Sequence, residues 1–256
     1  HWLQQVQNHN EGSCDIIFTT SEVQEAILTL NKRKSCAEDH VVGEMLQVLS
    51  EANIAILAEA FTRHIQGFSA APSGWHNLAA TLLPKHRQSV QGQDTRPITL
   101  LPVHYKLYMR CLMARFRNHI KEVMHPWTLG FRKGHQPAEV ISTLRQLIEK
   151  GIEWKEHIHI AKLDIKKAFD RLQHHKMFEA LRHFHVEEAI VRAIEKEYST
   201  TCTSTFHFHG IATEAIEITR GVRQGDPSAP LLFSCTMDFA LVDLVAVWKD
   251  RGLGLT

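Results

Sequence analysis

The sequence has few of the features that mark secreted or zinc-binding proteins. Its five cysteines lie far apart, include no Cys-x-x-Cys pair and make an odd total. This pattern excludes a disulfide framework and a zinc ribbon. No signal-peptide pattern opens the chain, which begins at His1 instead of a methionine. We therefore expect a piece of a longer protein that works inside the cell, where thiols stay reduced.

Only one apolar run, residues 229–248, has the length of a membrane span. Its interior carries Asp238 and Asp243, and each would be costly in lipid. We therefore expect a buried core helix and no membrane contact. A chain of 256 residues with 44% hydrophobic content can form one large domain or two coupled subdomains around such a core.

The net charge of +1 gives little sign of a polyanionic partner until it is divided along the chain. Residues 1–80 carry four Lys and Arg against nine Asp and Glu, residues 81–150 carry twelve against four, and residues 151–256 carry thirteen against fifteen. The middle third therefore holds a net charge of +8, the footprint of a local nucleic-acid site. A solvated basic face without a ligand remains the alternative, and charge counts alone do not separate the two.

The spacing of apolar residues predicts a mixed α/β fold. A ribbon of two short strands is expected over 75–85 and 96–101, a further strand over 157–165, and a hairpin over 204–221. Helical spacing predicts helices over 21–31, 43–64, 104–123, 136–150, 166–184, 187–198 and 231–249.

Asp164 follows the predicted strand 157–165 at a turn into a helix. A rigid strand can hold such a carboxylate in a cleft, where it binds a divalent cation. Aspartate is also a common helix cap at such a turn. For this residue alone, the cap is the preferred interpretation.

Two further segments carry possible ligand contacts. In RGVRQGDPSAPLLF, Gln224 and Gly225 predict a sharp turn whose amide can contact a base or sugar edge and whose glycine allows close approach. The predicted ribbon carries Lys85, Arg87 and Arg96, which could clamp a triphosphate or follow a nucleic-acid backbone. A plain turn and solvated cations are the alternatives for each segment alone.

Taken in order, these segments resemble reverse transcriptases, most closely the non-LTR (LINE-type) retrotransposon branch. KSCAEDHVVGEML resembles the family's opening motif, LLPK and DTRPITLLPVHYKL its fingers motifs, and LGFRKGHQPAEVI its Gly-Phe-Arg-x-Gly segment. LDIKKAFDRLQH matches the palm motif that carries the first catalytic aspartate, and GVRQGDPSAPLLF matches the motif beside the incoming nucleotide. The resemblance covers about residues 30 to 250, and the ordered set is far more specific than any one motif.

The resemblance implies a right-hand polymerase fold of the α/β (α+β) class. It places N-terminal helices and fingers in residues 1–150 and a partial palm in residues 151–256. The implied reaction is attack of a primer 3′-OH on the α-phosphate of a dNTP, with two Mg²⁺ ions stabilising the attacking and leaving oxygens. The implied partners are an RNA template, a DNA primer and the rest of a retroelement polyprotein, and the implied location is the nucleus.

The resemblance also implies a role for individual residues. Catalysis and Mg²⁺ binding fall to Asp164, with the backbone carbonyl of Ile165 as an auxiliary metal ligand. Phe169 matches the aromatic residue that lies under the sugar and disfavours ribonucleotides. The remaining implied contacts are Lys85, Arg96, Gln224 and Gly225 with the nucleotide, and Arg87, Arg132, Lys133 and Arg223 with nucleic acid.

Two departures from the family pattern limit these expectations. The usual Asp-Pro-Leu-Ser-Pro appears here as Asp-Pro-Ser-Ala-Pro over residues 226–230, and the Tyr/Phe-Ala-Asp-Asp hairpin does not occur in these 256 residues. Because one carboxylate cannot position two dications, we expect this chain by itself to be inactive as a polymerase. The alternative is a non-catalytic nucleic-acid-binding scaffold with a reverse-transcriptase-like fold.

Overall fold

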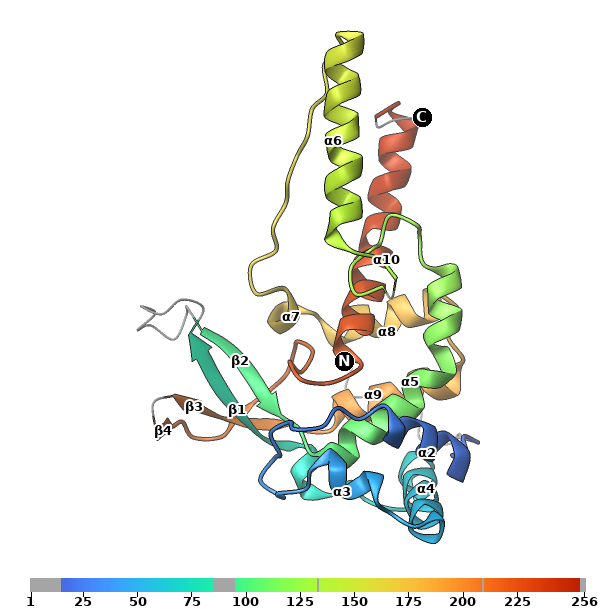
Figure 1. The fold of residues 1–256 in the computed structure, drawn as a ribbon, viewed down its shortest axis with the longest axis vertical. Coiled ribbons are helices and arrows are strands. Elements are labelled where there is room, and N and C mark those ends of the chain that lie inside the picture. The colour runs from blue at the N-terminus through green and yellow to red at the C-terminus, as the bar shows by residue number, and fades with distance from the viewer. Residues whose placement is uncertain (1–14, 85–94, 133, 209, 254–256) are drawn as a thin grey trace.

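The computed structural model describes residues 15–84, 95–132, 134–208 and 210–253. They form a mixed α/β fold in which a small sheet lies beside a larger helical part (Figure 1). The elements in chain order are α2 (Thr20–Leu28), α3 (Gly43–Gln47), α4 (Glu51–Ile65), η1 (Ser73–Trp75), β1 (Asn77–Pro84), β2 (Thr95–Leu100), α5 (Val103–Val123), α6 (Pro137–Trp154), α7 (Ala168–Arg171), α8 (His174–His183), α9 (Glu188–Ser199), β3 (Thr203–Phe208), β4 (Ile211–Ala212), β5 (Ile216–Glu217) and α10 (Ala229–Asp250).

The sheet joins strands from distant parts of the chain in the order β2-β1-β3-β4, with β5 also paired to β3. β1 and β2 form the expected antiparallel ribbon, with Ala79 opposite Leu100. β3 pairs antiparallel with β4 and β5, as the predicted hairpin requires. β1 and β3 pair in parallel, with Asn77 opposite Thr203, so one sheet spans the expected boundary at residue 150. That boundary stays a prediction.

The hydrophobic core is centred on α5, which is buried on most of its sides. Tyr108 of α5 makes edge-to-face contacts with Phe18 and Phe61, with ring centroids 5.9 Å and 5.5 Å apart. Trp75 makes a similar contact with Tyr105, at 5.2 Å. Such aromatic pairs add directional contacts to the area that they bury. They hold α4, η1 and the segment before α2 against one helix.

A buried polar cluster lies beside these rings. Glu197 of α9 is 1% exposed, and its carboxylate lies 2.6 Å from Nε2 of His64 on α4 and 3.9 Å from Nε2 of His76. Buried polar groups without partners are costly, so this cluster fixes how α9 packs against α4 and the approach to β1.

Two predicted helices are each divided in two. The helix expected over 43–64 breaks between α3 and α4, where the Ser50 side chain accepts a hydrogen bond from the backbone N–H of Asn53 and caps α4. The helix expected over 166–184 breaks between α7 and α8, where Leu172 and Gln173 are extended, with ψ of 126° and 124°. Apolar spacing continues across both breaks, so periodicity alone did not reveal them.

The predicted strand over 157–165 is wrong. These residues form no strand, and they return beside α6 toward α7, away from the sheet (Figure 1). Ile158 approaches α6 closely at Gly151, but Ile160 and Leu163 are 54% and 84% exposed. In the described ranges no other strand pairs with this segment, and a strand needs a partner for its backbone N–H and C=O groups.

The helix α10 is a core helix over its first half only. The carboxylate of Asp238 is fully buried and accepts hydrogen bonds from the backbone N–H of His125 and from Oγ1 of Thr128. Leu244, Val247 and Trp248 in the second half are exposed. By length and composition, α10 is the one described helix that could cross a membrane, a test that core helices also pass.

We predict that the thermal stability falls as the pH is lowered from 7 to 5. Burial lowers the pKa of His76, His104 and His174 below the ordinary value of about 6.5. The unfolded chain therefore binds more protons than the folded chain below that pH, and proton uptake favours unfolding.

Melting temperatures measured across this pH range check the prediction. The variant His76→Gln is expected to show a shallower pH dependence than the unmodified chain, because it removes one of the three groups. Parallel pH profiles for the two proteins would contradict the assignment to His76.

Candidate functional site

The candidate site is organised by the loop of residues 220–228, here called the glycine loop, which binds both α7 and β2. The N–H groups of Gly221 and Val222 donate to the carbonyl oxygens of Leu172 and Phe169, at 2.7 Å and 2.9 Å. On the other side, the N–H of Thr99 donates to the carbonyl oxygen of Gln224 at 2.9 Å. These three backbone bonds bring together the segment after Asp164, the basic ribbon and the Gln-Gly turn.

The two glycines of this loop are required by close backbone approach. Gly221 has φ of +89°, and a Cβ atom there would lie 2.9 Å from the backbone of Phe169 and Asp170. Gly225 has φ of +120°, and a Cβ atom would lie 2.6 Å from the carbonyl oxygen of Thr99. Real Cβ atoms do not come this close to backbone, and only glycine adopts such φ values without strain.

Arg223, which the sequence predicts to contact nucleic acid, is instead buried in the core. The residue is 7% exposed, and its guanidinium lies over the rings of Tyr105 and Tyr198, 5.3 Å and 5.4 Å from their centroids. It donates hydrogen bonds to the backbone carbonyls of Trp75 and Glu197. Arg223 therefore anchors the glycine loop in the core through cation–π and hydrogen-bond contacts.

Asp226 is a second internal anchor of the glycine loop. Its carboxylate accepts hydrogen bonds from the N–H and Oγ of Ser228, at 2.8 Å and 2.6 Å, and from the hydroxyl of Tyr105 at 3.1 Å. Burial raises the pKa of this carboxyl above its ordinary value, although the Ser228 bonds and the charge of Arg223 act in the opposite direction. The serine that departs from the family pattern thus supplies two of the bonds that hold the turn.

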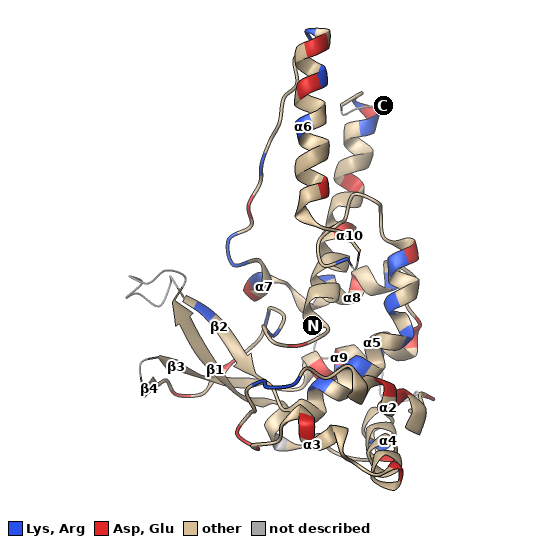
Figure 2. Cartoon of the chain, viewed as in Figure 1, with Lys and Arg blue, Asp and Glu red and all other residues tan. Residues whose placement is uncertain are grey.

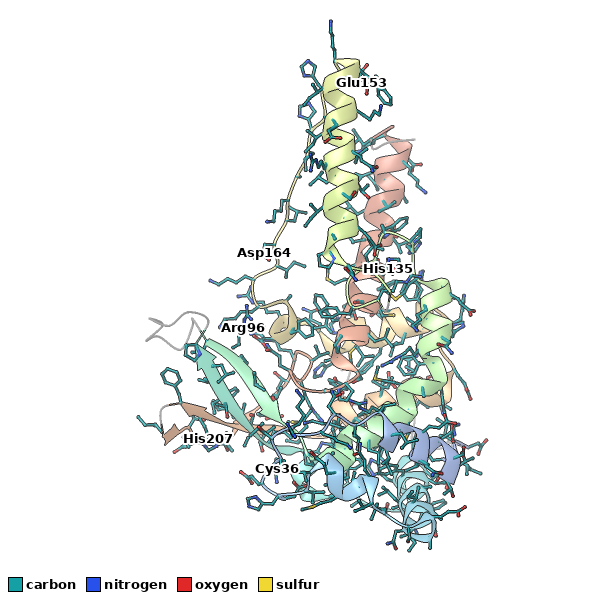
Figure 3. The ribbon with its side chains drawn as sticks, viewed as in Figure 1. Cys36, Arg96, His135, Glu153, Asp164 and His207 are labelled. Carbon is teal, nitrogen blue, oxygen red and sulfur yellow. The ribbon has the colours of Figure 1, made fainter. Side chains whose placement is uncertain are left out.

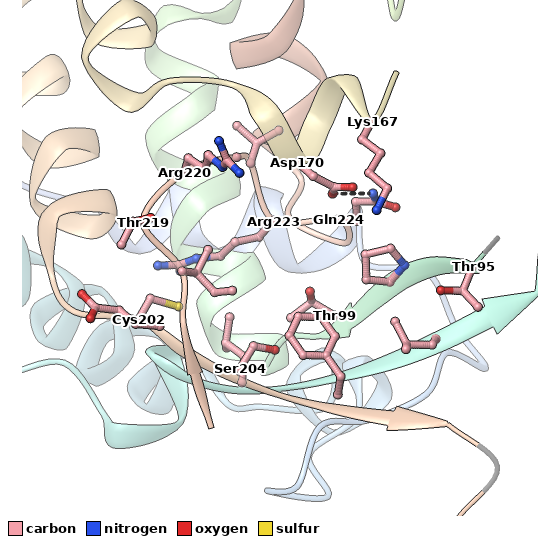
Figure 4. A pocket seen from close by; sticks show the side chains of 18 residues that line it. Thr95, Thr99, Lys167, Asp170, Cys202, Ser204, Thr219, Arg220, Arg223 and Gln224 are labelled. Carbon is pink, nitrogen blue, oxygen red and sulfur yellow. Dashed lines mark hydrogen bonds between the residues drawn. The ribbon is translucent and has the colours of Figure 1, made fainter. Parts of the chain in front are cut away.

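A cavity of about 450 Å³ lies between the glycine loop and one face of the sheet (Figure 4). Its floor is formed by alternate residues of three strands, because residues two apart share a face: Leu78, Leu82, Thr95, Pro97, Thr99, Ser204 and Phe206. Its polar lining includes Lys167, Asp170, Arg220 and Gln224. Nε2 of Gln224 donates to Oδ1 of Asp170 at 3.1 Å, which links the glycine loop to α7 by side chains as well.

Arg96 lies on the opposite face of β2 from this cavity. Thr95, Pro97 and Thr99 face the cavity, so Arg96 and Ile98 point away from it, and both are exposed. The structure therefore separates the predicted nucleotide contacts Arg96 and Gln224 onto two sides of one strand. Figure 3 shows Arg96 near the end of the ribbon, on the side of the molecule where the segment carrying Asp164 descends.

Asp164 and Ile165 lie on the exposed segment that precedes α7. A carboxylate and a backbone carbonyl are oxygen donors of the kind that Mg²⁺ prefers. However, the described residues contain no group of three or more His, Cys, Asp or Glu side chains that could hold a metal. The donor chemistry fits Mg²⁺, but the number of carboxylates does not fit a pair of ions.

Phe169 joins three parts of the chain in an aromatic stack. Its ring is half-buried and stacks on Phe233 of α10, with centroids 4.7 Å apart and an interplanar angle of 13°. Phe131 packs edge-on against it at 5.8 Å. This packing holds α7 against α10 and supports the glycine loop from behind.

The remaining predicted cations are placed as follows. Arg132 is partly buried, and its guanidinium donates to the backbone carbonyl of Lys121 on α5. Lys85, Arg87 and Lys133 lie outside the described residues.

Sequence reasoning missed the part that α7 itself plays in the cavity. Neither Asp170 nor Lys167 is among the site residues predicted from the sequence. The structure places both in the cavity lining, and Lys167 has a positive φ of +53° at the start of α7. Their spacing of three, which puts two side chains on one face of a helical turn, was the available signal.

Comparison with known proteins identifies the family. The sequence profile described as "Reverse transcriptase (RNA-dependent DNA polymerase)" matches residues 83–249. The chain belongs to the reverse transcriptase family. The matched range contains the glycine loop, α7, β2 and β3, which line the cavity, whereas the lining residues Leu78 and Leu82 of β1 precede it.

The relatives of this chain named below come from retrotransposable elements, as the sequence motifs predicted. The "Retrovirus-related Pol polyprotein from type-1 retrotransposable element R2" of Popillia japonica is 29% identical over 173 residues, which are 68% of this chain and 24% of that protein. The "RNA-directed DNA polymerase from mobile element jockey" of Drosophila melanogaster is 26% identical over 84% of this chain and 24% of its own length. This chain thus spans about a quarter of these relatives.

A solved structure shares the fold. The "Partial Cas6-RT-Cas1--Cas2 complex" matches with a TM-score of 0.51 and 16% sequence identity, covering 93% of this chain and 36% of the other. At this identity the match supports the architecture alone.

We predict that Gly225→Ala destabilises the protein by about 1–3 kcal/mol, the range for backbone strain at a special φ together with a close contact. The added Cβ would meet the carbonyl oxygen of Thr99. Gly130→Ala is the matched control, because a Cβ there would meet no atom within 4 Å, and it should change stability by less than about 0.5 kcal/mol. Chemical denaturation of both variants measures the difference, and equal stabilities would contradict the proposed docking of the loop.

Proposed function

We propose that this chain is the reverse transcriptase domain of a retroelement protein and contributes to RNA-directed DNA synthesis. The supporting observation is the docking of the glycine loop, which brings the Gln-Gly turn, the segment after Asp164 and the ribbon into contact. Membership of the family and the retrotransposon origin of the relatives support the same reaction class. The proposed substrates are an RNA template, a DNA primer and a dNTP, and the proposed location is the nucleus.

In this proposal the ribbon belongs to the fingers of a right-hand polymerase, and the segment from Asp164 through α8 belongs to the palm. Gln224 and Gly225 form the nucleotide-side turn, and Phe169 lies under the sugar of the incoming dNTP. Arg96, together with Lys85, meets the triphosphate or the template from the exposed face of the ribbon. Arg96 lies on the face of β2 opposite the cavity. This position favours a nucleotide that lies over the face carrying Arg96 and reaches the glycine loop at the edge of the sheet.

The proposed metal is Mg²⁺, which would supply charge neutralisation at the transferred phosphate. Asp164 and the carbonyl of Ile165 would provide two of its ligands. The other carboxylates would come from the part of the longer protein that this chain does not include, because the described residues bring no acidic cluster to Asp164.

A non-catalytic nucleic-acid-binding scaffold is the second candidate. The same lack of an acidic cluster in the described part of the chain favours it. The two candidates share a nucleic-acid surface and differ in whether a longer chain, with further carboxylates, makes DNA.

We predict that the 256-residue chain shows no primer extension on an RNA template, whereas a longer chain that continues beyond residue 256 does. In the longer chain, Asp164→Ala should lower the rate by more than about a hundredfold, because loss of a direct metal ligand exceeds the 10–100-fold effect typical of outer-shell partners. Gel-based primer extension with Mg²⁺ measures both. The conservative control Asp170→Asn, which keeps an acceptor for Gln224, should retain much of the activity.

Two results would count against this proposal. Extension by the short chain, lost in Asp164→Ala, would show that one carboxylate suffices. A longer chain that folds and binds nucleic acid without extending a primer would favour the scaffold.

Binding to nucleic acid can be tested on the short chain. We predict that its affinity for an RNA/DNA duplex falls steeply between about 50 mM and 200 mM salt, because Lys and Arg contacts to phosphates release counterions. Fluorescence anisotropy at several salt concentrations gives the slope of log K against log salt, which should be reduced by about one for Arg96→Gln. A flat salt response would contradict a polyanion site in the basic third of the chain.

A further inference from the structure

A second cavity, of about 230 Å³, lies on the other side of the glycine loop. Gln224 lines the first cavity, whereas Gly225 and Pro227 line the second, so the two are separated by the loop itself. The remaining walls come from the loop between α2 and α3 and from the first turns of α5. No role in the proposed polymerase reaction has been assigned to this second cavity.

The lining of the second cavity is basic. It includes Lys34, Lys106 and Arg110 and no Asp or Glu. None of these three cations forms an ion pair with a carboxylate within the described ranges. Burial, and then the charge of Arg110, lowers the pKa of Lys106, while the charges of Asp226 and Asp39 act in the opposite direction. The lining thus carries three positive charges and no carboxylate that would offset them.

Arg110 presents an unused edge of its guanidinium. One nitrogen, Nη1, donates to the carbonyl oxygen and the Oγ1 of Thr29, at 2.9 Å and 2.7 Å, which fixes the side chain. The buried Nε has no hydrogen-bond partner in the structure. A fixed guanidinium with free donors is suited to bidentate binding of a tetrahedral oxyanion.

The amino end of α5 also faces this cavity. Val103, its first residue, lines the cavity, and the N-cap Pro102 provides no side-chain hydrogen bond to the first turn. The first N–H groups of a long helix, together with its dipole, favour an anion. The basic lining, the fixed guanidinium of Arg110 and the amino end of α5 therefore point to the same kind of ligand.

We propose that this second cavity binds a phosphate group. Arg110 and Lys34 would contact its oxygens, and Lys106 and the amino end of α5 would add positive charge. The phosphate belongs either to the backbone of a single-stranded nucleic acid or to a free phosphate compound. Figure 2 shows further basic residues along α5. Arg117 lies two turns after Arg110 and is exposed, so a polynucleotide could continue along this helix.

The test uses the 256-residue chain with two probes, inorganic pyrophosphate measured by calorimetry and a short labelled oligouridylate measured by anisotropy. Arg110→Gln and Lys34→Gln are each expected to weaken binding of at least one probe by about tenfold, because each removes a charge-assisted contact. Arg110→Lys, which keeps the charge and loses the fork, should fall between. Arg145→Gln is the control, since Arg145 lies on α6 and pairs with Glu149.

The outcomes separate the two sources of phosphate. Displacement of pyrophosphate by the oligonucleotide assigns the site to a nucleic-acid backbone, and pyrophosphate binding without displacement assigns it to a free phosphate compound. Equal affinities of Arg110→Gln, Lys34→Gln and Arg145→Gln for both probes, or no binding of either probe, overturn the proposal. Circular dichroism checks folding, and Lys34→Gln keeps the test valid if Arg110→Gln unfolds, because Lys34 lies on a loop. Primer extension by the longer chain tests the polymerase proposal independently, so failure here is distinct from failure of that proposal.

Discussion

The glycine loop can reach its neighbours only because two of its residues lack a side chain. At Gly221 the backbone of α7 occupies the space where a Cβ would be, and at Gly225 the backbone of β2 does. The hydrogen bonds to Phe169, Leu172 and Thr99 form at those same places. Any larger residue would meet the backbone of that neighbour and push the loop away from it. The geometry of both candidate sites therefore depends on backbone contact, and the chemistry of the side chains comes second.

The buried side chain of Arg223 anchors the same loop in the core. Arg223 is enclosed by two tyrosine rings and backbone carbonyls, and the carboxylate of Asp226 is held by Ser228 and Tyr105. Removing one partner from such a buried arrangement is costly because the other is left without compensation. The loop thus has two opposite requirements. It needs glycine at 221 and 225 for close approach to neighbouring backbone, and a large cation at Arg223 as an anchor in the core. This explains why four consecutive residues, from Val222 to Gly225, have such different environments.

Much of the fold followed from local patterns, while the roles of single residues often did not. The ribbon of β1 and β2 and the helices α5 and α9 were predictable because alternation and helical spacing are properties of short segments. The burial of Arg223 was not, since it depends on aromatic rings supplied by two distant helices. The same limit applies to Arg96, whose face of the strand depends on sheet register, and to the parallel pairing of β1 with β3, which joins distant parts of the chain.

The segment that carries Asp164 shows why a sequence motif can be present without a complete metal site. A metal ligand must be held within a fraction of an ångström, and a strand achieves this through its ladder of hydrogen bonds. In the described structure, residues 157–165 have no such ladder, and the segment is positioned by α6 at Ile158 and by the start of α7. Its large apolar side chains remain in water, although burying each would stabilise the fold by about 1.5–3 kcal/mol. The described part of the chain therefore brings to Asp164 neither the partner carboxylates nor the rigid support that a two-metal site requires.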